Sequence, residues 1–468
     1  MKLFKPLLLL IFLAPALSGY SGMTIQVAGV AQLTPLLDDI YIAGSFNDWN
    51  PADENFKLNE QDGIFSIVID GIENSTIEFK FTRGVNWDTV EGDVVGAYIP
   101  NRTATFLDGT TAIFYIEGWE DIAGNHTVEP QVFILDTDFQ MPQLNTTRRI
   151  WIRLPNEYDS STDHYPVIYM HDGQNLFDAA TSFAGEWEVD NFFTAASLME
   201  CNESIVIGID NGGLSRMDEY SPWLNSTYNE GGSGAQYAEF IVATLKPYID
   251  QHFRTLPERE HTFTAGSSLG ALIAMYMVAE HNEVFGGAGL FSPAFWFNED
   301  IYDFVANAEM NASTKLYFVC GDSESDNLVA EMQSMITESI NGGVSNSNIQ
   351  SLVSPGGEHN EYWWSQYFPA YYMFQLGCES GIADHPFRLV NIYPNPAGDK
   401  LYVDRKHHEL QRIVIIDNSG KVVLDQILRN DAPVDISALS TGVYTARIQC
   451  MPHLTSTVVT DSHILIKK

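Results

Sequence analysis

The chain has 468 residues, of which 45% are hydrophobic and 18% are charged, the composition of a globular protein. It carries 61 Asp and Glu against 24 Lys and Arg, a net charge of −37. Such a field repels nucleic acid and anionic membrane surfaces, so we expect neither as a partner. The length exceeds what one hydrophobic core sustains and predicts roughly three domains.

The N-terminus has the form of a signal peptide. Lys2 and Lys5 precede a short apolar run, residues 7–14, and the small residues of a cleavage site follow at 16–18. A helix needs about 20 apolar residues to cross a bilayer, so this run is too short. No later segment qualifies either. We therefore expect residues 1–18 to be removed and the mature chain to be exported without a transmembrane segment.

The four cysteines, Cys201, Cys320, Cys378 and Cys450, are widely spaced and form no C-x-x-C pair. Export permits disulfides, but this spacing leaves the pairing open. The sequence contains no H-E-x-x-H motif and no cysteine–histidine cluster. We expect structural cysteines, no metal site and no cofactor.

The pattern of the chain changes twice. Residues 23–119 alternate short β-type runs with turn clusters, which predicts a small antiparallel β-sandwich, and residues 120–130 read as a linker. Residues 131–377 alternate strand-like and helical stretches, which predicts a mostly parallel sheet covered by helices. Residues 386–468 are strand-rich again and predict a second small β-domain. In a parallel sheet the reactive site lies beyond the carboxyl ends of the strands.

The stretch TAGSSLGALIA contains two adjacent serines. Only Ser268 is the middle residue of a G-x-S-x-G motif, which Gly266 and Gly270 complete. This motif places a nucleophilic serine on a sharp turn between a strand and a helix, and the flanking runs here have those two patterns. Ser267 then fills space in the turn.

Residues that could complete a catalytic triad follow in the order serine, acid, histidine. Asp322, Glu324 and Asp326 cluster after the next strand-like runs, and His359 lies in a glycine-rich loop after the last. A serine hydroxyl needs an imidazole to take its proton, and the imidazole needs a carboxylate to orient it. The spacing alone leaves the choice among the three acids open.

A second loop can supply an oxyanion hole. The segment YMHDGQNLFD follows an early apolar strand of the domain and contains Gly173. Its amide could face the amide of Leu269, and two such donors suit a developing oxyanion.

Together the segments HDGQNLFD, GSSLGALIA, GDSESDN and GEHNEYWW resemble the esterase D/enterochelin-esterase group of α/β-hydrolases. That group includes the feruloyl and acetyl-xylan esterases of carbohydrate esterase family one. The resemblance covers nearly all of residues 131–377 and implies the α/β-hydrolase fold, flanked here by an N-terminal and a C-terminal β-sandwich.

Matched residue by residue, the resemblance implies Ser268 as nucleophile, His359 as base and Glu324 as acid, with Asp322 as the alternative acid. It also implies Leu269 and Gly173 as the oxyanion amides, with Gln174 as an alternative to Gly173.

The segments IYIAGSFNDWNP and IEFKFTRGVNWDTVEGDVVGAYIPNRTATF resemble a starch-binding-type carbohydrate-binding module. The match implies that Lys80, Trp87, Glu91 and Asn101 bind glycan, whereas Trp49 is expected to anchor the core. Modules of this shape also serve only as packing domains, so a brace remains the alternative.

The tail resembles the C-terminal sorting domain of the type IX secretion system. The match rests on the turn at 393–396, the hairpin at 417–420 and the run LSTGVY at 439–444. It implies the type IX secretion machinery as a partner and a location outside the cell or on its outer surface. A further binding sandwich is the alternative.

The sequence thus predicts a secreted serine esterase that removes feruloyl or acetyl groups from polysaccharide or oligosaccharide through an acyl-enzyme. One alternative is a siderophore or small-ester hydrolase of the same family. The other is a catalytically inactive glycan-binding surface protein. The acyl group, the sugar and the oligomeric state stay open.

Overall fold

The computed structural model describes most of the chain between residues 22 and 467. The predicted signal peptide lies outside the described residues, as do Cys201 and Cys378, whereas Cys320 is buried and free. Two compact units are present, residues 1–198 with 202–365, and residues 199–201 with 366–468. The described ranges are 22–70, 75–183, 185–196, 203–376, 392–393, 398–403, 408–417, 421–428, 433–452 and 459–467.

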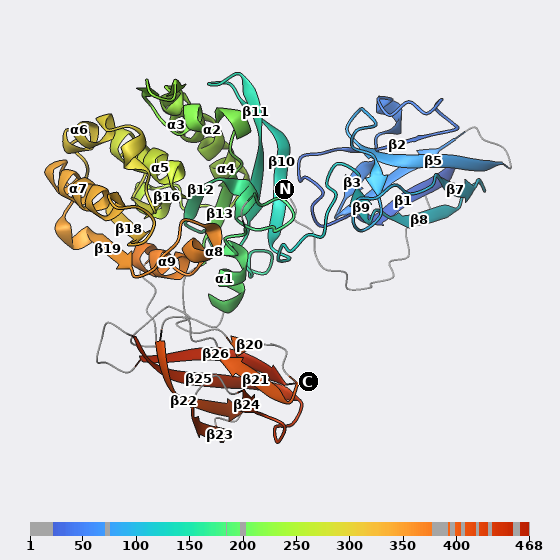
Figure 1. Cartoon of the computed structure of the whole chain (residues 1–468). Coiled ribbons are helices and arrows are strands. Elements are labelled where there is room, and N and C mark those ends of the chain that lie inside the picture. The colour runs from blue at the N-terminus through green and yellow to red at the C-terminus, as the bar shows by residue number, and fades with distance from the viewer. Residues whose placement is uncertain are drawn as a thin grey trace. The chain divides into compact units, whose positions relative to one another are not determined.

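An eight-stranded sheet forms the centre of the first unit, in the order β10-β11-β13-β12-β16-β17-β18-β19 (Figure 1). Strands β13, β12, β16, β17, β18 and β19, in this order across the sheet, run parallel. At one edge β10 pairs antiparallel with β11, and β11 pairs antiparallel with β13. This is the α/β-hydrolase-like fold that the resemblance implied, with a mixed sheet. The strands are β10 (Val132–Met141), β11 (Thr146–Arg153), β12 (Val167–His171), β13 (Ile205–Ile209), β16 (Thr262–Ser267), β17 (Gly287–Phe291), β18 (Lys315–Gly321) and β19 (Ile349–Ser354).

The inner strands are near-continuous apolar runs because helices cover both faces of a parallel sheet. Every residue of β12, β13, β16 and β17 is buried. The helices of this unit are α1 (Val189–Ala196), α2 (Arg216–Glu219), α3 (Gly234–Phe240), α4 (Lys246–His252), α5 (Leu269–Glu280), α6 (Asp300–Ala306), α7 (Leu328–Asn341) and α8 (Glu361–Ser365), and a small hairpin pairs β14 (Leu224–Asn225) with β15 (Glu230–Gly231).

Helix α5 lies deepest among these helices. Its residues 269–279 are all buried, and it packs against β16 and β17. A helix that is apolar on every side is stable only in such surroundings. The core therefore fixes the N-terminal end of α5, where Ser268 lies.

Within residues 22–70 and 75–119, two small sheets and a two-stranded pair contribute apolar side chains to one core. Ile25, Ile42 and Phe79 have no exposed surface. The first sheet is not purely antiparallel as predicted, because β1 pairs with β8 in parallel. The sheets have the orders β3-β4-β1-β8 and β2-β5-β7, with β1 (Met23–Gly29), β2 (Ile40–Gly44), β3 (Asn59–Gln61), β4 (Ile64–Ile69), β5 (Thr76–Arg83), β7 (Arg102–Thr105) and β8 (Thr111–Tyr115), and β6 (Glu91–Gly92) pairs with β9 (Gly118–Trp119).

In its described residues, the second unit contains one helix and two sheets, in the orders β20-β21-β24 and β23-β22-β25-β26. Their pairings are antiparallel, and Leu401, Ile413, Ile415 and Ile448 are fully buried in a core of their own. Across the described ranges, no helix combines the length and apolarity that a membrane crossing needs. The elements are α9 (Phe368–Leu376), β20 (Ile392–Tyr393), β21 (Lys400–Val403), β22 (His408–Asp417), β23 (Val422–Ile427), β24 (Val434–Asp435), β25 (Gly442–Pro452) and β26 (Val459–Lys467).

Candidate active site

Ser268 lies at the turn between β16 and α5 with φ 56° and ψ −121°. A side-chain-bearing residue adopts this conformation only where its surroundings impose it, at a cost of about 1–3 kcal/mol. Two backbone hydrogen bonds impose it here. The Ser268 amide donates to the Phe291 carbonyl at 2.9 Å, and the Ser268 carbonyl accepts from the Ala294 amide at 3.0 Å.

The two glycines of the motif are required by close contacts of the backbone. A Cβ atom at Gly266 would lie 2.7 Å from the carbonyl carbon and oxygen of Gly270. A Cβ atom at Gly270 would lie 3.3 Å from a carboxylate oxygen of Asp172, tighter than most real contacts. The G-x-S-x-G spacing therefore follows from how tightly strand, turn and neighbouring loop pack.

His359 and Glu324 form a hydrogen-bonded pair. The His359 Nδ1 atom lies 2.6 Å from Glu324 Oε2, and the side chains are 45% and 2% exposed, respectively. With Nδ1 donating to the carboxylate, Nε2 is the ring nitrogen that can accept a proton. Asp322 instead accepts from the Gly356 amide at 2.7 Å and so shapes the loop that carries His359. Asp326, the third acid of the cluster, is exposed.

Gly173 and Leu269 follow neighbouring strands of the sheet, β12 and β16. Gly173 begins a 3-10 turn, Gly173–Asn175, and Leu269 begins α5. A Cβ atom at Gly173 would lie 2.6 Å from the amide nitrogen of Ile209, so only glycine fits. The side-chain oxygen of Gln174 accepts from the Asn211 amide at 3.1 Å.

Asp172 holds the loop that carries Gly173. It has φ 56°, and its carboxylate accepts two hydrogen bonds from Arg216, at 2.7 and 2.9 Å. Burial is the largest effect on the pKa of this carboxyl and would raise it, but the charge of Arg216 and the hydrogen bonds from Arg216 and Asn211 together hold the pKa below its usual value. The adjacent His171 is buried, and desolvation lowers its pKa to about 4, so it stays neutral.

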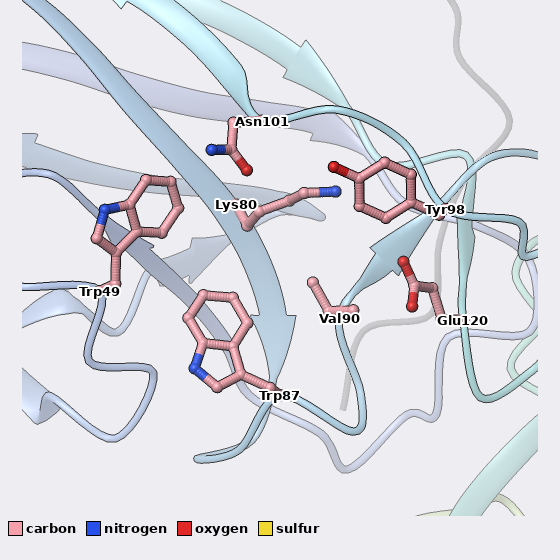
Figure 2. Close-up of a pocket in the computed structure, with 7 residues that line it drawn as sticks. All are labelled: Trp49, Lys80, Trp87, Val90, Tyr98, Asn101 and Glu120. Carbon is pink, nitrogen blue, oxygen red and sulfur yellow. The ribbon is translucent and has the colours of Figure 1, made fainter.

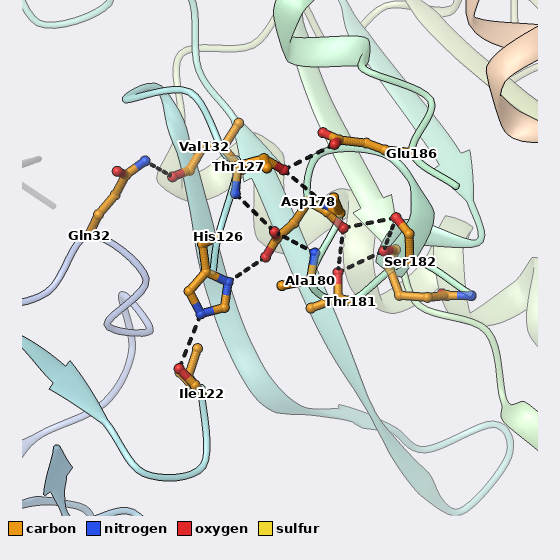
Figure 3. Close-up of polar contacts among 12 residues, drawn as sticks. Gln32, Ile122, His126, Thr127, Val132, Asp178, Ala180, Thr181, Ser182 and Glu186 are labelled. Atoms are coloured by element: carbon orange, nitrogen blue, oxygen red, sulfur yellow. Dashed lines mark hydrogen bonds and ion pairs between the residues drawn. The ribbon is translucent and has the colours of Figure 1, made fainter. Parts of the chain in front are cut away.

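The predicted linker is bonded to the loop that follows Gly173 (Figure 3). The buried carboxylate of Asp178 accepts from His126 Nδ1 at 2.6 Å and from the Thr127 amide at 3.2 Å. The Thr127 hydroxyl accepts from the Ala179 amide at 2.8 Å and donates to Glu186 at 3.0 Å. With the Glu129 amide, which donates to Asp190 at 2.8 Å, the linker provides partners for three carboxylates, and no motif in the sequence indicated this.

Two carboxyls beside the linker have raised pKa values. Burial, with nearby Asp190 and Glu188, raises the pKa of Glu186 to about 7. Burial likewise raises the pKa of Asp190 to about 6, although the Glu129 amide bonds to its carboxylate. The hydrogen bond to Asp178 raises the pKa of His126.

Replacing Glu186 with glutamine should stabilise the protein at high pH. Its pKa of about 7 in the folded state exceeds the usual 4.5, so folding favours the protonated form and stability falls as pH rises between these values. Because the carboxylate is partly exposed, we expect Glu186→Gln to raise the free energy of unfolding by about 1 kcal/mol at pH 8 and to change it little at pH 5.

Denaturant unfolding at both pH values measures this difference. Glu239→Gln, a change at an exposed glutamate of α3, is the control and should give no such pH dependence. An equal gain for Glu186→Gln at pH 5 and pH 8 would contradict the assignment.

The N-terminal sheets carry a pocket of about 300 Å³ (Figure 2). The rings of Trp49 and Trp87 lie side by side there, with 6.3 Å between centroids. Trp49 lines this pocket and does not anchor the core as expected. The Lys80 amine donates to the Ile99 carbonyl and lies 4.9 Å from the centre of the Tyr98 ring. The lining residues are Trp49, Lys80, Trp87, Val90, Tyr98, Asn101 and Glu120.

Of the predicted glycan-binding residues, Lys80, Trp87 and Asn101 line this pocket. Glu91 does not line it, because its side chain is fully buried. Its carboxylate accepts from the Phe81 amide at 2.9 Å and from Arg102 at 2.7 Å. In the part of the chain that the structure describes, no group of His, Cys, Asp and Glu side chains could hold a metal ion.

Residues 142–373 match the family model Esterase, described as "Putative esterase". The chain is an esterase. Residues 391–459 of this esterase match the secretion system C-terminal sorting domain. The esterase is therefore secreted to the cell surface or to the outside.

Over 182 residues the esterase is 26% identical to YbbA, an uncharacterized protein of Bacillus subtilis (strain 168). The matched region covers 38% of the esterase and 68% of YbbA. Over 90 residues it is 41% identical to an α-amylase of Niallia circulans. This matched region covers 19% of the esterase and 7% of the amylase. A solved ferulic acid esterase is 18% identical, covers 53% of the esterase and 98% of that chain, and has a TM-score of 0.40. The last likeness carries no conclusion about substrate.

Proposed function

We propose that the esterase removes acyl groups, of feruloyl or acetyl type, from polysaccharide or oligosaccharide through an acyl-enzyme. Ser268 is the nucleophile, His359 the base and Glu324 the orienting acid. The hydrogen bond of 2.6 Å between His359 and Glu324 carries this proposal. Glu324 follows β18 and His359 follows the adjacent strand β19, in the sheet whose strand β16 ends immediately before Ser268.

In this mechanism the Ser268 hydroxyl attacks the ester carbonyl and passes its proton to His359 Nε2. Glu324 stabilises the imidazolium, and the amides of Gly173 and Leu269 donate to the oxyanion. The bond to the alcohol oxygen breaks, and His359 returns the proton to that oxygen. A water molecule then attacks the acyl-enzyme, giving its proton to His359. The bond from carbon to the serine oxygen breaks and Ser268 regains a proton.

The pocket of the N-terminal sheets supports a glycan as the carrier of the ester. Flat aromatic rings such as Trp49 and Trp87 can stack on sugar rings, and the polar ends of Asn101 and Glu120 can bond hydroxyl groups. The similarity over 90 residues to an α-amylase also favours a glycan. A neutral sugar polymer is not repelled by the net charge of −37.

Ser268→Ala should abolish ester hydrolysis. Without the hydroxyl no acyl-enzyme forms, so we expect kcat for p-nitrophenyl acetate to fall on the order of 10⁴-fold or more. Release of p-nitrophenol measures the rate, and circular dichroism verifies folding. Ser267→Ala, a change at the adjacent serine, is the matched control. Activity surviving in Ser268→Ala would refute the nucleophile.

Glu324→Gln and Asp322→Asn distinguish the two candidate acids. A neutral amide in place of the Glu324 carboxylate cannot stabilise an imidazolium, so kcat should fall about 10³-fold or more. The Asp322 carboxylate accepts from the Gly356 amide and the Ser323 hydroxyl, not from His359, so we expect its variant to lose less than about tenfold. Both rates are measured on p-nitrophenyl acetate. The reverse ranking would transfer the acid to Asp322.

Trp87→Ala should weaken glycan binding and leave the chemistry intact. Losing one stacked ring should lower the affinity for soluble xylan or starch fragments about tenfold, with kcat for p-nitrophenyl acetate unchanged. Titration calorimetry measures the binding, and Val85→Ala, at an exposed apolar residue of the same loop, is the control. If the wild-type protein gives no heat on titration with these glycans, the module does not bind them and acts only as a packing domain.

A panel of esters tests the substrate class. Feruloyl or acetyl release from arabinoxylan, identified by mass, supports the polysaccharide. Hydrolysis of a siderophore ester alone would favour the small-ester hydrolase. Activity on no ester would favour an inactive glycan-binding protein.

A further inference from the structure

Ser292 is a buried polar residue that no sequence motif indicated. It follows β17 directly, has no exposed surface and adopts φ 42°. Its hydroxyl lies 2.8 Å from Glu324 Oε1 and 2.8 Å from the indole nitrogen of Trp364. Ser292 therefore lies between the proposed catalytic acid and a buried tryptophan.

The direction of these two hydrogen bonds follows from the chemistry of indole. The ring nitrogen of Trp364 can only donate, so the Ser292 oxygen must accept from it. The Ser292 proton is then directed to Glu324 Oε1. The Gly321 amide donates to the same oxygen at 2.5 Å. With Oε1 occupied by two donors, Oε2 meets His359 Nδ1 at 2.6 Å.

Trp364 also contacts the base. The planes of the Trp364 and His359 rings meet at 82° with 5.0 Å between centroids, an edge-to-face arrangement. The ring of Trp187 packs against the ring of Trp364, with 5.6 Å between their centroids. One indole thus limits the tilt of the imidazole and orients the hydroxyl behind the acid.

The turn at 291–294 connects this arrangement to the nucleophile. The Phe291 carbonyl accepts from the Ser268 amide, and the Ala294 amide donates to the Ser268 carbonyl. Between these two residues, the Ser292 amide donates to the Val319 carbonyl of β18 at 2.7 Å. The same short turn therefore holds the backbone of Ser268 and the carboxylate of Glu324.

The backbone conformation argues that the hydroxyl matters. At φ 42° glycine has no steric cost, whereas serine does. What serine provides in return for this steric cost is the hydroxyl group that donates to Glu324.

We propose that Ser292 and Trp364 are positioning residues of the esterase, which fix the carboxylate of Glu324 so that Oε2 meets His359 Nδ1. This inference rests on the proposed triad. The N–H group of Trp364 acts through the Ser292 hydroxyl, and Ser292 acts through Glu324. Neither residue exchanges a proton with substrate.

Steady-state kinetics of single and double variants tests the inference. Ser292→Ala and Ser292→Gly should each lower kcat for p-nitrophenyl acetate about 10- to 100-fold, the effect of losing a hydrogen bond to a charged group, with KM within about twofold. Ser292→Gly should keep or raise the melting temperature, because it also relieves the backbone. A merely structural role predicts lower stability with intact kcat.

The indole is tested by Trp364→Phe, which keeps an aromatic ring but removes the N–H group. We expect kcat to fall about three- to tenfold. The double variant Ser292→Ala/Trp364→Phe should match Ser292→Ala within about twofold, because the N–H group acts only through the hydroxyl and the phenylalanine ring keeps the contact with His359. Trp187→Phe, an equal change in the neighbouring ring, should keep kcat within about twofold.

The inference is overturned if both Ser292 variants keep kcat within twofold of the wild type. It is also overturned if the Trp364 and Ser292 losses multiply in the double variant, or if Trp187→Phe loses as much as Trp364→Phe. Failure of the proposed triad gives a different result, because Ser268→Ala would then remain active. An inactive Ser268→Ala beside unimpaired Ser292 variants rejects this inference alone.

Discussion

The carboxylate of Glu324 imposes the main constraint on the site. Its side chain is almost completely buried, and a buried charge is tolerated only where hydrogen-bond donors surround it. Three donors meet it, from Gly321, Ser292 and His359. They come from the end of β18, the turn after β17 and the loop after β19. Satisfying one charge therefore requires three strand ends to be in register.

The sheet brings about that register. β17, β18 and β19 are consecutive neighbours in space as well as in sequence, and β16, which leads to Ser268, pairs with β17. Parallel strands end at the same edge, so loops far apart in the chain meet there. The buried helix α5 then presents its first amide, that of Leu269, at the same edge. The order of the strands alone therefore brings the loops of the proposed site together at this edge.

Much of this arrangement could be predicted from the sequence because it leaves local marks. The G-x-S-x-G motif reflects backbone contacts that exclude a Cβ atom, and the strand-like runs of the central domain correspond to buried strands. The choice between Glu324 and Asp322 could not be made from spacing, because the two carboxylates lie on one loop and differ in direction. Only the family resemblance favoured Glu324, the residue whose carboxylate meets His359.

Other features left no such mark. Ser292 is one serine after a strand, and its contacts with Glu324 and Trp364 join residues 32 and 72 positions away. Trp49 was expected in the core because large aromatic residues usually pack there, yet it lines the pocket beside Trp87. Glu91, matched to a binding residue by resemblance, is buried beside Arg102. Tertiary pairing decided each of these positions.

The bonds between the linker and the loop after Gly173 bear on where the hydrolase can be separated from the rest of the chain. A polypeptide beginning at residue 131 would lack His126 and Thr127, and Asp178 and Glu186 would lose the partners that these residues provide. The shortest segment that keeps all of these contacts begins at Ile122, whose carbonyl meets His126. Most of the residues that the sequence predicts as a linker therefore belong with the hydrolase domain.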